Sequence, residues 1–263
     1  MIEIPEAVIR QALHPFSTLP VDPSNQRVVG RYTSILLHKL PMPEIVEPRP
    51  SLTIADVDAA VEESRAVVRE YEKSSTVWLT GPDHPWLADA LAQRGLRNED
   101  SAGMESVETA MALLQDPCAQ VKGIVVSLVD SFEALQAGYR VELASFGSMA
   151  DEWAAVEARM NELWQNYNSP DSNKRWNASL DGRVVGTARG AFGDGGVNLF
   201  GGAVLPDARG HGVYRALVQA RWDAASALKV PALTVQAGRM SRPVLEGLGF
   251  TPIAEMPTYV DHF

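Results

Sequence analysis

The residues with the clearest chemical potential lie in one short segment, Arg209-Gly210-His211-Gly212, which follows residues 204–206 and precedes an amphipathic helical pattern. Two glycines two positions apart allow a close approach to the backbone. The first N–H groups of the following helix have no partner within the helix, and the helix dipole adds partial positive charge there. With Arg209 and His211, this arrangement suits a phosphate or pyrophosphate. Taken alone, the glycines are also explained by a tight turn that holds no ligand.

Two common phosphate-binding motifs do not fit this segment. A dinucleotide-binding loop needs a third glycine where Arg215 stands, and a Walker loop needs Gly-Lys-Ser/Thr, which the sequence lacks. The preceding residues also predict an antiparallel meander, whereas both of those motifs belong to parallel sheets. The segment therefore fits neither nucleotide-binding fold.

Residues 204–217 are similar to a motif of the GCN5-related N-acetyltransferases (GNAT), V-x-P-x-x-R-G-x-G-[VI]-x-x-x-L. The matching residues are Val204, Pro206, Arg209, Gly210, Gly212, Val213 and Leu217. The predicted order of elements resembles the family too: a strand, two helices, three antiparallel strands, the loop and its helix, then a strand, a helix and a last strand. The resemblance covers about residues 121–260 and favours the anion-site interpretation.

The resemblance implies that the loop binds acetyl-CoA or a related acyl-CoA. The pyrophosphate is expected on the backbone amides from Arg209 to Tyr214, and the pantetheine arm along the strand that ends at Val204 and Leu205. The family's strands before and after the loop and its helix splay apart, which leaves room for the thioester. The cofactor-binding residues expected on this basis are Ala203, Val204, Leu205, Arg209, Gly210, His211, Gly212, Val213 and Tyr214.

The chemistry implied is direct attack of a neutral amine on the thioester, with an N–H near Val204 stabilising the oxyanion. The sequence departs from the family at Asp207, where Gln or Arg is common, at Leu245, where a tyrosine acid usually stands, and near Gly238, where an asparagine is usual. No catalytic base or acid is predicted. Tyr214 is expected mainly to pack, and the histidines show no metal-ligand spacing.

Elements that would position this loop are readable in the second half of the chain. Apolar runs and turn residues predict strands at 123–129, 175–180, 183–192, 197–205, 232–237 and 251–260. Helices are predicted from Phe132 towards Phe146 with Ser131 as cap, over 149–167, from Val213 to Leu228, and over 241–249. Asp181-Gly182 predicts a tight hairpin.

The first half is less regular. Its eight prolines before residue 51 are expected to break any long element, and the sequence does not identify the elements there. A helix after Thr53, a strand at 75–80 and a short helix ending at Gly95 follow. Residues 76–96 and 234–250 share a strand, a proline turn, a short helix and a glycine, which either common local patterns or an ancestral duplication explains. We expect residues 1–117 to form a degenerate acetyltransferase-like lobe and residues 118–263 the acetyl-CoA-binding domain.

Composition narrows the classes of function. The formal charge of −10 over 263 residues argues against non-specific nucleic-acid binding, which needs a basic face. No apolar run approaches the roughly 20 residues of a membrane span, and the first ten residues do not resemble a signal peptide. The lone Cys118 excludes an internal disulfide framework and fits a reducing compartment, so we expect a cytoplasmic protein.

These observations together predict an α/β protein with a mixed, mostly antiparallel sheet flanked by helices, the acyl-CoA N-acyltransferase fold, in two lobes. We expect an N-acetyltransferase that uses acetyl-CoA as cosubstrate and no metal, and that acetylates the amine of a small molecule. Two alternatives stay open. One is a non-catalytic protein that binds or senses acyl-CoA, and the other is a partner-binding scaffold whose loop is a relic.

Overall fold

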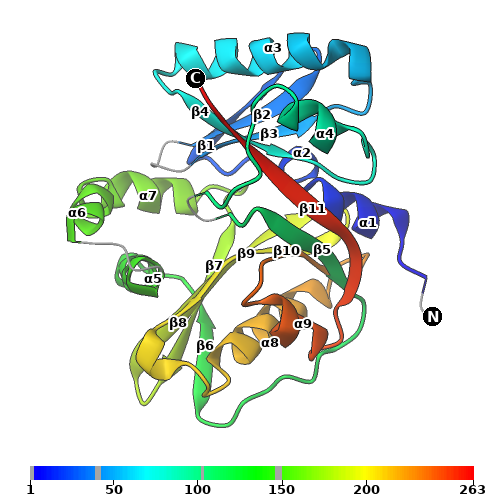
Figure 1. Ribbon diagram of the computed structural model, residues 1–263. Helices are drawn as coiled ribbons and strands as arrows, with labels where there is room; N and C mark the ends of the chain where they lie inside the picture. The colour runs from blue at the N-terminus through cyan, green and yellow to red at the C-terminus, as the bar shows by residue number, and fades with distance from the viewer. Residues whose placement is uncertain (1–2, 39–42, 102–103, 146–149) are drawn as a thin grey trace.

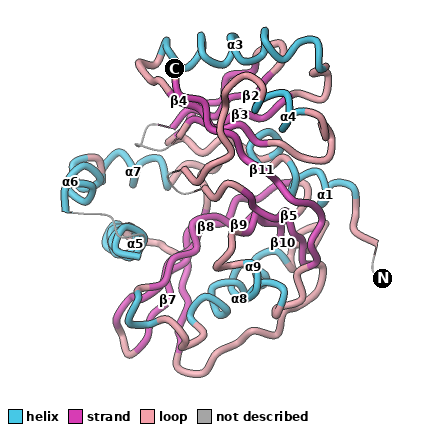
Figure 2. Tube along the Cα trace, in the orientation of Figure 1, coloured by secondary structure: helices cyan, strands magenta, loops and turns pink. Residues whose placement is uncertain are grey.

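A single twisted sheet runs through the whole molecule. The computed structural model describes residues 3–38, 43–101, 104–145 and 150–263. The sheet has eleven strands in the order β1-β2-β3-β4-β11-β5-β10-β9-β8-β7-β6. Helices cover both faces, and the strands pass without a break from one end of the molecule to the other (Figure 1, Figure 2). The predicted α/β class, with a mixed and mostly antiparallel sheet, is confirmed.

The second half contributes an antiparallel meander of four strands. These are β6 (Ile124–Leu128), β7 (Lys174–Leu180), β8 (Arg183–Gly193) and β9 (Gly196–Val204). Asp181 and Gly182 both have positive φ, at 49° and 78°, as a tight primed turn between β7 and β8 requires. The next strand, β10 (Leu233–Ala237), runs parallel to β9. The predicted strands and hairpin are confirmed.

Helices pack on the two faces of this meander. One face carries α5 (Phe132–Ser145), α6 (Ala150–Ala158) and α7 (Met160–Tyr167), and the other carries α8 (Val213–Ala225) and α9 (Arg242–Glu246). Ser131 caps α5 as predicted, because its Oγ accepts the Ala134 N–H at 3.2 Å. The prediction of one helix over 149–167 is wrong, since α6 and α7 are separated at Arg159, whose φ and ψ are −105° and 5°.

The first half forms more regular structure than its prolines indicate. It contains α1 (Glu6–Leu13), α2 (Pro15–Thr18), β1 (Asn25–Val29), β2 (Thr33–His38), β3 (Glu44–Pro48), the short η1 (Ile54–Asp56), α3 (Val57–Glu70), β4 (Ser75–Leu79) and α4 (Leu87–Ala92). The elements before residue 51 are four to eight residues long, so they fit between the prolines or begin at one. These lengths agree with the expectation that the prolines break any long element, although the short elements themselves were not predicted.

Two strands join the halves of the chain. The unpredicted β5 (Val107–Leu113) lies between β10 and β11, although it precedes β6 in the sequence. The last strand, β11 (Thr251–His262), pairs with β5 through its first half and with β4 through residues 258–262. Figure 1 shows β11 crossing from the lower to the upper part of the molecule. The division at residue 117 stays a prediction, and the strand just before it completes the sheet of the second half.

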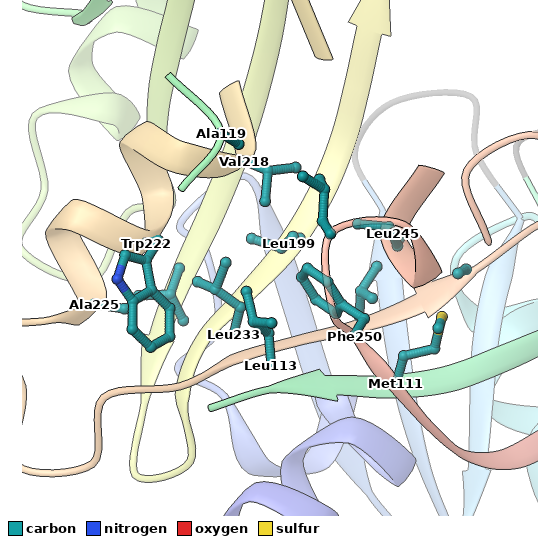
Figure 3. Packing of buried hydrophobic residues seen from close by; sticks show 14 residues of the cluster. Met111, Leu113, Ala119, Leu199, Val218, Trp222, Ala225, Leu233, Leu245 and Phe250 are labelled. Carbon is teal, nitrogen blue, oxygen red and sulfur yellow. The ribbon is translucent and has the colours of Figure 1, made fainter. Parts of the chain in front are cut away.

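The largest core cluster lies between α8, α9 and the strands β5, β9 and β10. Figure 3 shows Leu199, Leu233, Leu113 and Phe250 facing Val218 and Trp222 of α8. A second core lies under α3 and α4 around the fully buried Trp78. The first core holds the base of α8 fixed, and it thereby fixes the loop that leads into this helix.

Candidate functional site: the loop before α8 and the divergence of β9 from β10

The segment predicted to bind an anion joins β9 to α8. It passes through a short helical turn, η2 (Pro206–Ala208), and reaches α8 at Val213. Gly210 and Gly212 have φ values of 81° and 80°, in the left-handed region that glycine adopts most readily. A Cβ on Gly212 would lie 3.0 Å from the side chain of Val121, whereas one on Gly210 would meet nothing within 4 Å. Gly212 is thus required by conformation and by packing, and Gly210 by conformation alone.

The turn presents a row of unpaired backbone donors. Within the described residues, no oxygen accepts a hydrogen bond from the backbone N–H groups of residues 210–215, and no side chain caps α8. The first bond of the helix runs from the Ala216 N–H to the Gly212 oxygen at 3.0 Å. Six successive free donors at a helix N-terminus suit an anion with several oxygens. This arrangement fits a pyrophosphate.

Charged side chains around the loop hold its shape. The Arg209 guanidinium donates from Nε to the Val204 oxygen at 3.3 Å and from Nη2 to the Ser145 oxygen at 3.2 Å. His211 is exposed, with Nδ1 at 3.1 Å from the Arg209 oxygen. Asp207 pairs with Arg183 at 2.6 Å on the surface. The carboxylate that departs from the family pattern is thus neutralised by its own ion pair.

Strands β9 and β10 separate just before the loop. They pair only at Val197–Leu233 and Asn198–Thr234, and the edge of β9 that faces β10 has no partner beyond that point among the described residues. Ala203, Val204 and Leu205 therefore lie on β9 and its end where that edge is open. An extended chain such as a pantetheine arm can pair with such an edge as an added strand does. The splay implied by the family resemblance is present.

A bulge interrupts β9 at the start of this open edge. The register with β8 shifts between Thr187 and Arg189, and Gly201 has a φ of 51°. A Cβ on Gly201 would lie 2.8 Å from Nη2 of Arg189, and one on Gly202 would lie 2.7 Å from the Tyr214 ring. The two glycines thus leave room for a guanidinium on one face of β9 and for an aromatic ring on the other. Sequence reasoning missed both glycines and Arg189.

Tyr214 contributes to the site through its backbone rather than its hydroxyl. Its ring packs against the core beneath α8, and its amide belongs to the first turn of the helix. Burial raises the pKa of its hydroxyl, although the nearby Arg221 guanidinium acts in the opposite direction. Of the predicted cofactor residues, Val213 is buried in the core as well, so neither residue presents its side chain to the loop.

A buried ion cluster lies on the α5 face beside the bulge. Glu142 of α5 forms ion pairs with Arg175 of β7 at 2.8 Å and with Arg189 of β8 at 2.9 Å. Burial alone would raise the pKa of Glu142, but the two guanidinium groups outweigh it and lower that pKa. Glu142 is therefore a carboxylate that holds the arginines, and its low proton affinity does not suit a catalytic base.

Position 245, where the family resemblance places an acid for the leaving group, lies inside the core. Leu245 is fully buried and belongs to the same core cluster as Leu199 (Figure 3). Asn198 accepts a hydrogen bond from the Thr234 hydroxyl at 2.8 Å, so it has a structural partner. Of the three glutamates on the helices at 149–167, Glu157 lies 4.0 Å from Arg140 and Glu162 pairs with Arg159, while the side chain of Glu152 lies outside the described residues.

The first half has a related arrangement without the anion site. Its β3 and β4 run parallel and pair at three successive positions, and α3 connects them. The connection contains Thr53, whose hydroxyl donates to Asp56 at 2.5 Å at the start of α3. A carboxylate at this helix N-terminus disfavours a bound anion, because the two negative charges would repel each other. Among the described residues, only the loop at 209–212 combines splayed strands with free donors.

In the part of the chain that the structure describes, no group of three or more His, Cys, Asp or Glu side chains is placed to hold a metal ion. No helix of the described residues is long and apolar enough to cross a membrane.

Comparisons with known proteins agree with this geometry. Residues 135–250 match the family model described as "Acetyltransferase (GNAT) family". No curated protein sequence matches the chain. Among solved structures, a GCN5-related N-acetyltransferase from Kribbella flavida is similar at a TM-score of 0.67 and 19% identity, covering 97% of this chain and 95% of that one.

Two other solved structures show the same fold. A tandem GNAT protein from the clavulanic acid biosynthesis pathway has a TM-score of 0.59 and 15% identity, covering 98% of this chain and 88% of that one. A GCN5-related N-acetyltransferase from Sphaerobacter thermophilus has a TM-score of 0.58 and 14% identity, over 89% and 82% of the two chains. The family match contains the whole loop, the bulge and the splayed strands. Residues 135–250 of this chain therefore match the GNAT acetyltransferase family, and the chain as a whole has the fold of the GNAT structures.

Proposed function

We propose that the protein transfers an acetyl group from acetyl-CoA to the amine of a small molecule. The observation that carries this proposal is the row of free N–H groups at residues 210–215, which stands directly after the open edge of β9. The GNAT fold supports acyl transfer from acyl-CoA. The proposal also specifies that the transferred group is acetyl, that the acceptor is a small molecule and that the protein is cytoplasmic.

The proposed roles follow the geometry of the loop. The amides of residues 210–215 hold the pyrophosphate, and Arg209 keeps the loop against the ends of β9 and α5. The open edge of β9 at Ala203 to Leu205 pairs with the pantetheine arm, and a free N–H of this strand polarises the acyl carbonyl. His211 and Val213 complete the turn.

The reaction needs no residue to protonate the thiol. The amine nitrogen attacks the thioester carbon, the C–S bond of the tetrahedral intermediate breaks, and the amine proton passes to solvent. With a thiol pKa of about 8.5, thiolate is an adequate leaving group near neutral pH. The absence of a hydroxyl at Leu245 is compatible with this route.

A non-catalytic acyl-CoA sensor is the second candidate, and the burial of Leu245 favours it. Thiol release from acetyl-CoA in the presence of an amine panel separates the two candidates. An enzyme releases thiol in proportion to acceptor, whereas a sensor binds acetyl-CoA and releases none.

Titration of the native protein with acetyl-CoA in a calorimeter tests the shared part of both candidates. We expect binding in the micromolar range, as a few charge-assisted contacts to the phosphates support. A folded protein that binds no acetyl-CoA contradicts the proposal.

A further inference from the structure

Arg189 lies where an acceptor would meet the thioester, if the proposed function is correct. Its guanidinium lies against Gly201, at the bulge where the open edge of β9 begins. It is on the face of the sheet covered by α5, while the loop's helix α8 covers the other face. When an acyl-CoA lies along β9 with its pyrophosphate at the loop, its acyl end is therefore placed beside Arg189.

The arginine is held in place and not neutralised. Its side chain is 30% exposed, whereas Glu142 is 16% and Arg175 2% exposed. Within the described residues, Glu142 is the one carboxylate paired with either arginine, so the three side chains carry one net positive charge. Nε of Arg189 is buried and has no hydrogen-bond partner there. Because an uncompensated charge in a partly buried site is costly, this cluster favours a bound anion.

Groups from the first half face the same place without supplying a negative charge. His38, at the end of β2, is 8% exposed. Burial lowers its pKa to about 4, and the positive charges of Lys73 and Arg189 contribute, so its imidazole is neutral at physiological pH. The carboxylates of β3 are engaged elsewhere, Glu44 with Lys73 and Glu47 with Ser17. The positive charge of Arg189 is thus left to a ligand.

An apolar surface adjoins the guanidinium. Phe200, the register partner of Arg189, has its ring 5.9 Å from the ring of Phe16 on α2. A ligand between the halves of the molecule therefore meets a cation and two aromatic rings together. This combination suits a small organic acid better than a polycationic amine.

We propose that Arg189 binds a carboxylate of the acceptor, and that the acceptor is an amino acid or another small amine that carries a carboxylate. Arg189 is then a specificity-determining residue. Its fork geometry matches a carboxylate through two N–H donors, and Glu142 fixes the orientation of the fork. The attacking amine stays free to reach the thioester, because the carboxylate and not the amine is bound by the arginine.

Matched pairs of amines test the inference. Phenylalanine is compared with phenethylamine, tryptophan with tryptamine, lysine with cadaverine and ornithine with putrescine, each with acetyl-CoA and a thiol-release readout. The Cys118→Ser background removes the exposed protein thiol that would react with the reagent. We expect at least one carboxylate-bearing amine to have a kcat/KM about tenfold or more above its partner, as a charge-assisted contact predicts.

Substitution of Arg189 then assigns the preference to this residue. Arg189→Gln is expected to raise KM for the carboxylate-bearing amine about tenfold or more, with kcat and the decarboxylated partner little changed. Arg189→Lys keeps the charge, loses the fork, and is expected to fall in between; it also replaces the glutamine variant if that one does not fold. Arg140→Gln, on the exposed side of α5, removes an arginine 59% exposed and serves as the control.

Three results would overturn the inference. They are turnover that favours the decarboxylated amines, an Arg189→Gln effect that is equal for both members of each pair, and no turnover of any member by a protein that binds acetyl-CoA. The last result leaves the acetyl-CoA site intact and rejects the acceptor class. Failure of the native protein to bind acetyl-CoA would instead reject the proposed function, and this inference with it.

Discussion

Glu108 is a single residue whose titration affects the stability of the fold. It lies on β5, the strand of the first half that completes the sheet of the second. Burial raises its pKa to about 7 from an ordinary value of 4.5, and the negative charge of Glu105 adds to this. The folded protein therefore binds this proton more tightly than the unfolded chain does. The stability due to Glu108 is fully present below pH 4.5 and is lost as the pH rises to about 7.

Replacing Glu108 with glutamine tests this linkage. Glu108→Gln is expected to be more stable than the native protein by about 1–2 kcal/mol at pH 8, where the native carboxylate is ionised, and nearly equal to it at pH 5. Urea unfolding at both pH values measures the difference. Glu70→Gln, at an exposed position of α3, is the control. Equal effects of Glu108→Gln at the two pH values would show that its carboxyl titrates normally.

Single residues also show what the sequence could predict of the site. The loop was found because its glycines, Arg209 and Val213 lie within a few positions of one another. Glu142 and Arg189 are 47 positions apart on different elements, so no local pattern relates them. Gly201 resembles any glycine in a strand until the bulge and the nearby guanidinium are known. Contacts of this kind depend on tertiary packing, which local sequence does not encode.

At the scale of elements, a largely buried ion pair adds to the β4 pairing that joins the end of β11 to the first half. Asp261 of β11 is 4% exposed, and Arg65 of α3 donates to it from Nε and Nη2, both at 2.9 Å. Phe263 lies under the guanidinium groups of Arg65 and Arg69, at 5.6 and 4.9 Å. Removal of Arg65 would leave a buried carboxylate without a partner.

Arg65→Met is therefore expected to lower the free energy of unfolding by about 2–3 kcal/mol. The matched control is Arg94→Met, which removes an arginine whose partner Asp58 is 79% exposed, and which should cost less than about 1 kcal/mol. Urea denaturation of both variants compares them. Equal losses of unfolding free energy in the two variants would show that burial of Asp261 does not make this ion pair more important for stability.

Element prediction succeeded where periodicity and turn chemistry agree. The meander, its Asp181-Gly182 turn, α8 and α3 all combine a clear apolar pattern with glycine or capping residues. It failed before residue 51, where short strands separated by prolines give too few residues for a period. It also failed at β5, because "VETAMAL" shows no alternation. Packed structure covers both faces of that strand, α1 on one and the core beneath α9 on the other. Neither row of its side chains faces water, so its sequence does not alternate between polar and apolar residues.

At the scale of the whole molecule, the exchanged strands make the two halves one cooperative unit. Met111 and Leu113 of β5 belong to the core of the second half, and β11 completes the sheet of the first. We expect one urea transition, with tryptophan fluorescence and far-ultraviolet circular dichroism coincident, because neither half retains its core without the other. Residues 118–263 alone should not fold to a form that binds acetyl-CoA. Two separate transitions, or a binding-competent fragment, would contradict this.

We propose that the loop before α8 binds acetyl-CoA through its free N–H groups. Calorimetric titration of the native protein, Gly210→Asp and Gly95→Asp tests it most directly. Both glycines have left-handed φ values, 81° and 87°, and a Cβ on either meets nothing within 4 Å, so the two variants carry similar strain. Only Gly210→Asp places a carboxylate among the donors. We expect Gly210→Asp to weaken acetyl-CoA binding at least about tenfold and Gly95→Asp to bind acetyl-CoA as the native protein does. Equal binding by all three folded proteins would contradict it.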